Sequence, residues 1–364
     1  MTEYIYDLEN WPNFTWDYEK ITKPLGEVRN KQGKLIGKMS ALGFSMEEEA
    51  VLKTVSLEIV KSSEIENEKL NENEVYSSIA KHLGMDKPGL VPSSRQVDGI
   101  VEMTLDAVLN YKEPLTKERL FEWHKSLFSE NKSRLKVIGN WSPNQMYVIS
   151  GRPGKEIIEY IAPSPDRVPF EMDQFLERIN SNEKIDPVLK AGIAHLWFVI
   201  IHPFEDGNGR ITRVMTDMLL ARADDTPRRF YSMSAQIQKE RKEYYKMIQK
   251  TQTGTLDITD WLIWFLKIAE KAIDASESTI GNILQKTDFW KKHSETNFND
   301  RQTKVIKLLL GDFEGKLTTS KWAKITKTSQ DTALRDIKDL IQKGVLEQKA
   351  EGGRSTSYKL SDLK

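Results

Sequence analysis

The most apolar run of the chain, AHLWFVII at residues 194–201, leads directly into the polar stretch HPFEDGNGR at residues 202–210. A second apolar stretch with a helical period follows at residues 214–220. A run that is apolar on all sides predicts a buried helix, and the periodic stretch predicts another helix. The glycines between them, Gly207 and Gly209, predict a sharp turn, because glycine adopts backbone conformations that a side chain would block.

Helical patterns also cover most of the chain on both sides of this turn. A helical period begins near Ser45, several helices are predicted within residues 72–134, and another begins at Phe170. Thr116 precedes one of these periods and is expected to cap its helix. The predicted fold class is therefore mainly α.

One segment departs from this helical pattern. The runs MYVIS and IIEYI, between Met146 and Ile161, are rich in β-type residues and surround a Pro-Gly pair. This arrangement predicts a β-hairpin. An isolated hairpin is only marginally stable in water, so we expect it to have a function, and the alternative is a surface hairpin without one.

The ends of the chain differ from its centre. Residues 1–44 are rich in aromatic side chains without a helical period, and we expect their rings to pack on a neighbouring domain. Residues 285–298 are polar and aperiodic, which predicts a linker. Residues 299–364 show three helical patterns and then two short β-type runs, an order typical of a winged helix-turn-helix domain. The central domain is then expected at residues 45–284.

Composition and charge restrict the classes of function. The 364 residues carry a formal net charge of zero, which argues against a chain devoted wholly to nucleic acid or membrane binding. Cysteine is absent and the N-terminal residues lack the blocks of a signal peptide, so we expect a soluble, cytoplasmic protein.

The C-terminal domain carries most of the positive charge. Residues 299–364 hold 14 Lys/Arg and 9 Asp/Glu, a net charge of +5, which leaves −5 for the rest. Its third predicted helix spans residues 329–343, and a helix that reads a major groove is usually more basic than this one. Its charged residues are Arg335, Lys338 and Lys343 against Asp331, Asp336 and Asp339. DNA and protein therefore both remain as candidate partners of this domain.

The turn at residues 202–210 combines groups that suit a nucleotide site. Gly207 and Gly209 expose backbone amides at the start of a helix, where anions and above all phosphates bind. Arg210 and Arg213 lie three residues apart, on one face of that helix, and extend the positive field. Taken one at a time these residues also fit an ordinary turn and a solvated helix face, and only their combination indicates a nucleotide site.

Two further side chains of the turn suit catalysis. Asp206 supplies a hard oxygen ligand of the kind that Mg²⁺ prefers. His202 can accept a proton near neutral pH, although a histidine after an apolar helix is more often a core residue.

The stretch resembles the signature of the Fic family: histidine, any residue, phenylalanine, any residue, Asp or Glu, then Gly-Asn-Gly-Arg, two residues and Arg. Every fixed position is matched, by His202, Phe204, Asp206, Gly207, Asn208, Gly209, Arg210 and Arg213. The resemblance covers residues 45–275 and implies a Fic-type helical domain with a hairpin flap. It also implies transfer of AMP from ATP to a Ser, Thr or Tyr hydroxyl of a target protein.

The resemblance assigns a role to each part of the site. His202 is the base, Asp206 holds Mg²⁺, and residues 207–209 with Asn208 bind the phosphate anion. Arg210 and Arg213 are expected to hold the β- and γ-phosphates. Tyr244 and Tyr245 are expected near the adenine, although both could equally be core rings. Met146, Tyr147, Val148 and Ile149 form the part of the flap that pairs with the target.

A second short pattern lies upstream. Ser62, Glu66 and Asn67 fill the inhibitory pattern of self-inhibited Fic proteins, which is Ser or Thr, three residues, Glu, then Gly or Asn. The resemblance therefore implies that Glu66 reaches Arg213 and obstructs the γ-phosphate. The alternative is that Ser63 and Glu66 form a capping box at the start of a helix.

Three alternatives stay open at this stage. The chain could be a DNA-binding regulator whose Fic domain senses nucleotide without turnover. It could also be a Fic enzyme that uses another donor or removes AMP. The aromatic N-terminal module, which resembles a small module found in front of Fic domains, suggests docking, including a homodimer.

Overall fold

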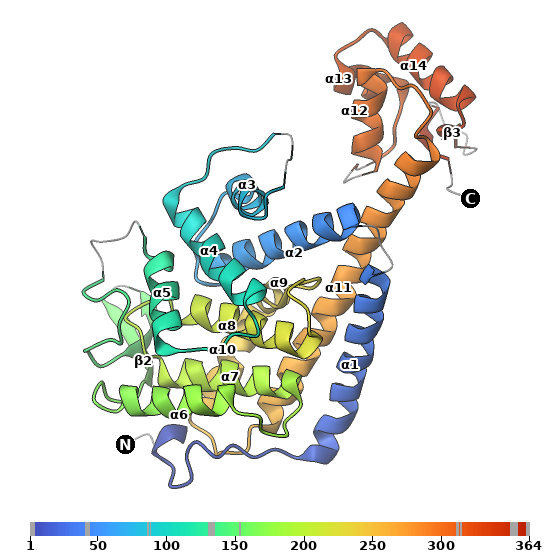
Figure 1. Cartoon of the computed structure of the whole chain (residues 1–364). Helices are drawn as coiled ribbons and strands as arrows, with labels where there is room; N and C mark the ends of the chain where they lie inside the picture. The colour runs from blue at the N-terminus through green and yellow to red at the C-terminus, as the bar shows by residue number, and fades with distance from the viewer. Residues whose placement is uncertain are drawn as a thin grey trace. The chain divides into compact units, whose positions relative to one another are not determined.

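The computed structural model describes residues 4–40, 44–85, 87, 89–129, 135–152, 154–310, 313, 315–349 and 356–361. The chain divides into two compact units, Met1–Glu277 and Ser278–Lys364 (Figure 1). Both units are mainly helical, and the described strands form two separate two-stranded sheets. The fold class predicted from the sequence, mainly α with a hairpin, is confirmed.

The first unit contains one short 3-10 helix, one hairpin and most of the helices. Its elements are η1 (Ile5–Asp7), α1 (Tyr18–Ser40), α2 (Phe44–Ile65), α3 (Glu72–His82), α4 (Arg95–Leu109), α5 (Lys117–Leu127), β1 (Tyr147–Arg152), β2 (Lys155–Ile161), α6 (Val168–Asn180), α7 (Pro187–Ile201), α8 (Asn208–Asp224), α9 (Met233–Lys239), α10 (Arg241–Gln252) and α11 (Thr259–Lys292), the last of which continues beyond Glu277.

Helices α7 and α8 form the centre of this unit and pack closely against each other. The side chain of Asp186 caps α7, where Pro187 occupies the first helical position and fixes a helical φ. The apolar run predicted to be a buried helix is α7, and Trp197, Phe198 and Ile200 are fully buried there. Burying this stripe fixes where α7 ends, and so positions the loop that follows.

The predicted hairpin is formed by β1 and β2, which pair antiparallel from Tyr147↔Ile161 to Arg152↔Lys155. The register shifts between Val148 and Ile149, which marks a bulge. The hydroxyl of Tyr160 donates a hydrogen bond to the carbonyl oxygen of Ile200 at 2.7 Å. The base of the hairpin is thereby fixed to the end of α7.

The N-terminal segment packs on this core. The rings of Trp11 and Phe14 lie edge-on against Trp197 at 6.2 and 5.8 Å, and the indole of Trp11 donates to Glu171 at 2.7 Å. The expected packing of the aromatic residues on a neighbouring domain is confirmed.

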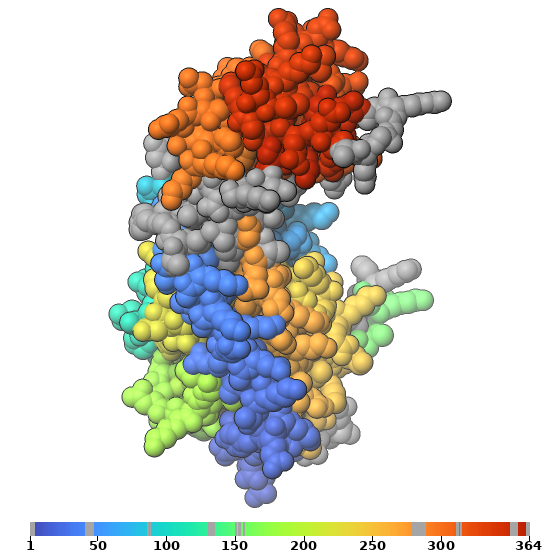
Figure 2. All heavy atoms as spheres, turned by 90° about the vertical axis from the view of Figure 1, so that its right-hand side faces the viewer, coloured from blue at the N-terminus to red at the C-terminus, as the bar shows by residue number. Residues whose placement is uncertain are grey.

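Helix α1 then runs along α11, as Figure 2 shows for the blue and orange segments. Lys31 forms ion pairs with Glu270 and Asp274 of α11 at 2.9 and 2.6 Å. Helix α1 is therefore tied to the helix that closes the first unit.

The second unit consists of α12 (Asp300–Leu309), α13 (Thr319–Thr326), α14 (Gln330–Gln342), β3 (Leu346–Gln348) and β4 (Tyr358–Leu360). Strands β3 and β4 pair antiparallel, and Leu317 forms an isolated bridge with Tyr358. The order of elements is the expected one, while the assignment to the winged helix-turn-helix class stays a prediction.

The linker expected at residues 285–298 needs a correction. Helix α11 continues to Lys292, so the irregular connection before α12 is shorter than predicted. The polar residues before Lys292 contain neither Gly nor Pro after Gly281, and polarity alone does not end a helix.

Among the residues with described positions, no helix has both the length and the apolar character needed to cross a membrane.

Candidate active site

The loop between α7 and α8 begins with a reversal of the backbone at His202. This residue has φ +51°, in the left-handed region, and its N–H donates to the carbonyl oxygen of Phe198 at 3.0 Å. Further along the loop, the Asn208 side chain binds both backbone groups of Phe204, four residues before it, accepting from N–H at 2.9 Å and donating to C=O at 2.7 Å. Asn208 therefore uses its side chain to hold the loop in place before α8.

The Phe204 ring anchors the loop to α5. It is fully buried and stacks on His124 of α5 with a centroid distance of 4.3 Å and an interplanar angle of 9°. The Nδ1 atom of His124 accepts from the N–H of Gly139 at 2.9 Å, so Nε2 carries the proton and donates to the carbonyl oxygen of Asp206 at 3.2 Å. Burial lowers the pKa of His124 to about 4, which keeps this ring neutral.

Glu205, at a variable position of the signature, has a role that the sequence did not reveal. Its Oε2 atom accepts from the backbone N–H of Lys136 at 2.9 Å and of Val137 at 3.3 Å. The carboxylate therefore holds a neighbouring loop against the motif. These partners lie 69 and 68 residues away in the sequence, and no local or periodic pattern of residues indicates such a contact.

Both glycines are required by their surroundings. Gly207 has φ +81°, and a Cβ atom placed there would lie 2.6 Å from Leu127. A Cβ atom on Gly209 would lie 2.2 Å from Oε1 of Glu66. The carboxylate of Glu66 therefore lies directly against the N-terminus of α8, where a phosphate is expected.

Arg213 is the residue that receives Glu66. The carboxylate Oε1 of Glu66 accepts from NH2 of Arg213 at 2.7 Å. Ser62 adds two acceptors, its hydroxyl for Nε at 2.8 Å and its carbonyl for NH2 at 2.9 Å. Ser62 thus contacts the arginine directly.

Ion pairing sets the protonation states of this contact. Burial raises the pKa of Glu66, but the charge of Arg213 and the hydrogen bond to it outweigh burial, and the net pKa is lowered. The Arg213 side chain is only 1% exposed. The pair is therefore fully ionised near neutral pH, and the guanidinium has no contact with bulk water.

The segment that carries Glu66 is the C-terminal end of α2. The N–H of Glu68 donates to the carbonyl of Ser63 at 2.9 Å, and the N–H of Asn67 to that of Glu64 at 3.0 Å. Asn67 has φ +61°. These bonds with a left-handed residue form a Schellman motif, in which Gly or Asn is favoured. The capping-box interpretation of Ser63 and Glu66 is wrong, because these residues lie at the end of a helix and not at its start.

Arg210 lies one turn before Arg213 and also contacts a carboxylate. Its NH1 donates to Oε2 of Glu68, and NH2 lies 3.8 Å from Oδ1 of Asp206. The Arg210 side chain is 4% exposed and its guanidinium lies over the Phe128 ring at 5.3 Å. Glu68 was not predicted as a site residue.

His202 reaches the same pocket. Burial lowers the pKa of His202 below 6.5, and the Val199 backbone and the Glu66 carboxylate oppose this shift only in part. The imidazole is therefore neutral near pH 7 and able to accept a proton.

Asp206 is the most exposed acidic group of the loop. Its side chain is 59% exposed, and Oδ1 accepts from the N–H of Gly207 at 2.6 Å. No cluster of three or more potential metal ligands occurs among the described residues. One exposed carboxylate nevertheless fits Mg²⁺, which is usually held by one or two carboxylates together with phosphates and water.

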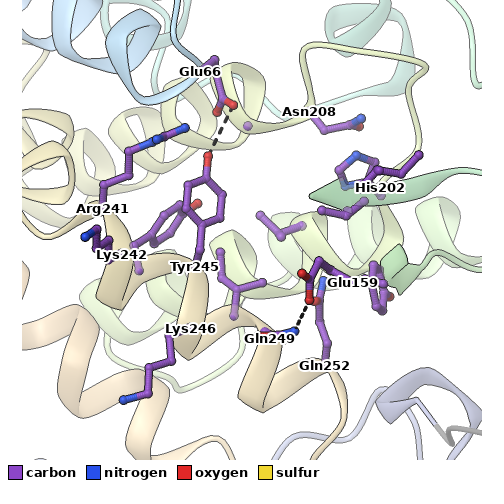
Figure 3. Close-up of a pocket in the computed structure, with 17 residues that line it drawn as sticks. Glu66, Glu159, His202, Asn208, Arg241, Lys242, Tyr245, Lys246, Gln249 and Gln252 are labelled. Atoms are coloured by element: carbon purple, nitrogen blue, oxygen red, sulfur yellow. Dashed lines mark hydrogen bonds between the residues drawn. The ribbon is translucent and has the colours of Figure 1, made fainter. Parts of the chain in front are cut away.

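A pocket of about 650 Å³ lies at the start of α8 (Figure 3). His202 and Gly209 line it from the motif, Glu66 from the turn that follows α2, and Val148 and Ile149 from the hairpin. The other flap residues named from the sequence, Met146 and Tyr147, do not line it.

The two predicted tyrosines line the pocket in different ways. Tyr244 is buried, and its hydroxyl lies 2.9 Å from Nε2 of His195. Tyr245 is 38% exposed, and its hydroxyl lies 3.5 Å from Oε2 of Glu66. Figure 3 shows the Tyr245 ring directed at this carboxylate. Tyr245 is thus the better placed of the two to contact a ligand.

The loop after α7 and the first turn of α8 set the neutral His202 and the backbone of Gly209 in this pocket, beside two buried arginines, and such groups suit a phosphate. Residues 114–220 match the Fic/DOC family, and residues 4–85 match a domain of unknown function, DUF4172. The chain therefore carries a Fic domain. The second match extends past the predicted module at residues 1–44 and includes α2 with Glu66.

Relatives of known class agree with this assignment. The protein adenylyltransferase Fic of Drosophila mojavensis is 30% identical over 138 residues, or 37% of this chain and 24% of that protein. The corresponding protein of Nematostella vectensis is 29% identical over 121 residues, or 33% and 26%. The chain thus matches about a quarter of the length of these curated relatives.

Solved structures agree on the fold. A Fic family protein from Desulfovibrio desulfuricans has a TM-score of 0.57 and 19% identity, covering 96% of this chain and 98% of that chain. Fic-1 from C. elegans has a TM-score of 0.50 and 19% identity, covering 71% and 73%. At these identities the likeness concerns the fold alone.

Proposed function

We propose that the protein transfers AMP from ATP to a Ser, Thr or Tyr hydroxyl of a target protein. The observation that carries this proposal is the convergence of His202, Gly209 and the hairpin on one pocket, next to two buried arginines. The arginines and the amides of α8 suit a polyphosphate, and the exposed hairpin residues Tyr147 and Ile149 suit an extended target segment.

In the proposed reaction the target hydroxyl attacks the α-phosphorus of ATP. A bond forms between the hydroxyl oxygen and the α-phosphorus, the bond to the bridging oxygen of the β-phosphate breaks, and pyrophosphate leaves. His202 accepts the hydroxyl proton, since burial keeps its imidazole neutral. The α8 amides with Arg210 and Arg213 stabilise the charge on the phosphates.

Mg²⁺ bound at Asp206 would neutralise the phosphate oxygens and favour the departure of pyrophosphate. The exposure of this carboxylate leaves room for such an ion.

We further propose that Glu66 inhibits the enzyme that carries it. Its carboxylate occupies Arg213 and lies against Gly209, so negative charge stands where the γ-phosphate is expected. ATP then binds with displaced phosphates and presents its α-phosphorus poorly. A misplacement on the order of 1 Å can cost about a hundredfold in rate.

The test uses ATP labelled on the α- or the γ-phosphate, purified protein with Glu66→Gly, and Mg²⁺. Label from the α-phosphate should enter protein and label from the γ-phosphate should not. His202→Ala in the same background should abolish incorporation and retain ATP binding. Entry of γ-label alone would identify a kinase, and loss of both activity and binding would make His202 a structural residue.

A DNA partner for the second unit is supported by a separate observation. Two of the three aspartates of α14 are paired inside the unit, Asp336 with Arg301 at 2.7 and 2.9 Å and Asp339 with Lys343 at 2.6 Å. The exposed residues Arg335 and Lys338 then face solvent with only one acidic neighbour on their helix. The outer face of α14 is thus more basic than its sequence suggests.

We therefore propose that the outer face of α14 contacts the phosphates of duplex DNA. Fluorescence anisotropy of the full chain with a labelled duplex should show an affinity that falls steeply with salt. The change Arg335→Ala with Lys338→Ala should weaken binding and flatten the log–log salt slope by about 2. The exposed lysines of α1, Lys23→Ala with Lys34→Ala, provide the charge-matched control. Absence of binding at low salt would favour a protein partner.

Several expectations stay predictions beside these proposals. They concern donors other than ATP, removal of AMP, a homodimer and the cytoplasmic location.

A further inference from the structure

We propose that Glu68 is a second inhibitory carboxylate, which competes with the β-phosphate of the nucleotide for Arg210. This inference rests on the proposed function only in taking Arg210 as the ligand of that phosphate. It concerns a residue outside the inhibitory pattern, which ends at Asn67.

The contact between Glu68 and Arg210 lies within the site. NH1 of Arg210 donates to Oε2 of Glu68, while the Arg210 side chain is 4% exposed and that of Glu68 is 35% exposed. In an ordinary surface ion pair both side chains are solvated, and the pair contributes little to the stability of the fold. Here the cation is buried next to the phosphate nest, and its partner reaches it from the solvent side.

The end of α2 places both carboxylates against α8. Glu66 and Glu68 flank Asn67, whose left-handed conformation ends the helix. Arg213 and Arg210 lie three residues apart on α8 and receive one carboxylate each. One turn of chain therefore occupies both arginines that the proposed reaction needs.

The two carboxylates compete with different phosphates: Glu66 with the γ-phosphate for Arg213, and Glu68 with the β-phosphate for Arg210. The Nε atom of Arg210 is buried without a hydrogen-bond partner among the described residues, and the Asp206 oxygen is 3.8 Å away. Glu68 is thus the close anionic partner of Arg210, and a β-phosphate must displace it. A nucleotide without a β-phosphate does not compete with Glu68 for Arg210.

This difference gives a test that does not depend on turnover. Titration calorimetry would measure the binding of ADP and AMP to the wild-type full chain and to Glu68→Gln. The variant removes the charge and keeps the shape, and we expect it to bind ADP about tenfold more tightly, as the loss of a charge-assisted competitor implies. Its affinity for AMP should remain unchanged.

Glu64→Gln is the matched control. Glu64 lies on the same helix end, pairs with Lys61 at 2.8 Å and contacts neither arginine. It should leave both affinities unchanged, and the melting temperatures of the variants should match that of the wild type. Glu68→Ala should give the same gain for ADP if charge is the cause.

The outcomes separate the two proposals. Unchanged or weaker binding of ADP to Glu68→Gln would overturn the inference, and weaker binding would mean that Glu68 orients Arg210 for its ligand. Equal gains for ADP and AMP would also overturn it, because they would show a general loosening of the pocket. A selective gain for ADP, with no α-label transferred by the Glu66→Gly protein, would support the role of Glu68 while refuting the proposed reaction.

Discussion

Replacing Glu66 with glycine is expected to raise AMP transfer by about thirtyfold. The change removes the 2.7 Å bond between the carboxylate and Arg213, whose side chain is 1% exposed, while Glu66 itself is 30% exposed. A hydrogen bond to a charged group is worth about 1.5–3 kcal/mol, and the partial exposure of Glu66 places it near ~2 kcal/mol. At about 1.4 kcal/mol per factor of ten, this gives the thirtyfold figure.

The assay is single-turnover incorporation of α-labelled AMP into the protein itself, with Mg²⁺ and saturating ATP. Glu66→Gln should give a smaller increase, because the neutral amide keeps its bulk close to Gly209. Glu64→Gly introduces the same flexibility into the last turn of α2 without touching Arg213, and should change the rate little. Equal acceleration by Glu64→Gly and Glu66→Gly would refute the reasoning, since a loosened helix end would then suffice.

Three further changes test other parts of the site. In the Glu66→Gly protein the rate should hold from neutral pH upward and fall only below pH 6.5, because the pKa of His202 is lowered and its neutral form is the base; an acid limb centred above pH 7 would contradict this. Asn67→Gly should keep the inhibition, whereas Asn67→Val should weaken it, because a β-branched residue strains the left-handed conformation, and basal incorporation measures the difference. Gly209→Ala should displace Glu66 by steric overlap and also distort the nest, so it should bind ATP less tightly without any gain in transfer, as calorimetry and the label assay would show.

The centre of the fold could be predicted because its signals are local. An apolar run, a glycine turn and a periodic stretch predicted α7, the loop and α8, and two β-type runs around a Pro-Gly pair predicted the hairpin. Burial of α7 then follows from its composition alone. The start of the predicted linker was wrong, because polar residues without Gly or Pro are compatible with a helix, and α11 continues through them to Lys292.

The contacts that define the site are the part that local signals could not supply. Glu66 and Arg213 lie 147 residues apart, and only the resemblance to a family connected them. Glu68 and Glu205 are single carboxylates without a period or a motif, so their partners are visible only in three dimensions. The residue types of Ser63 and Glu66 also fit a capping box at the start of a helix. In the structure, Asn67 adopts the left-handed conformation that ends a helix.

The packing of Trp11 and Phe14 on Trp197 has a practical consequence for anyone who wishes to activate the enzyme by deletion. Shortening the chain past Glu66 would remove the carboxylate that we propose to be inhibitory, and with it the rings that cover a fully buried indole of α7. The exposed apolar patch would favour aggregation, and an inactive truncated protein would wrongly suggest that the N-terminal part is needed for catalysis. Point substitutions keep the cover in place, and so separate the loss of inhibition from the loss of a soluble fold.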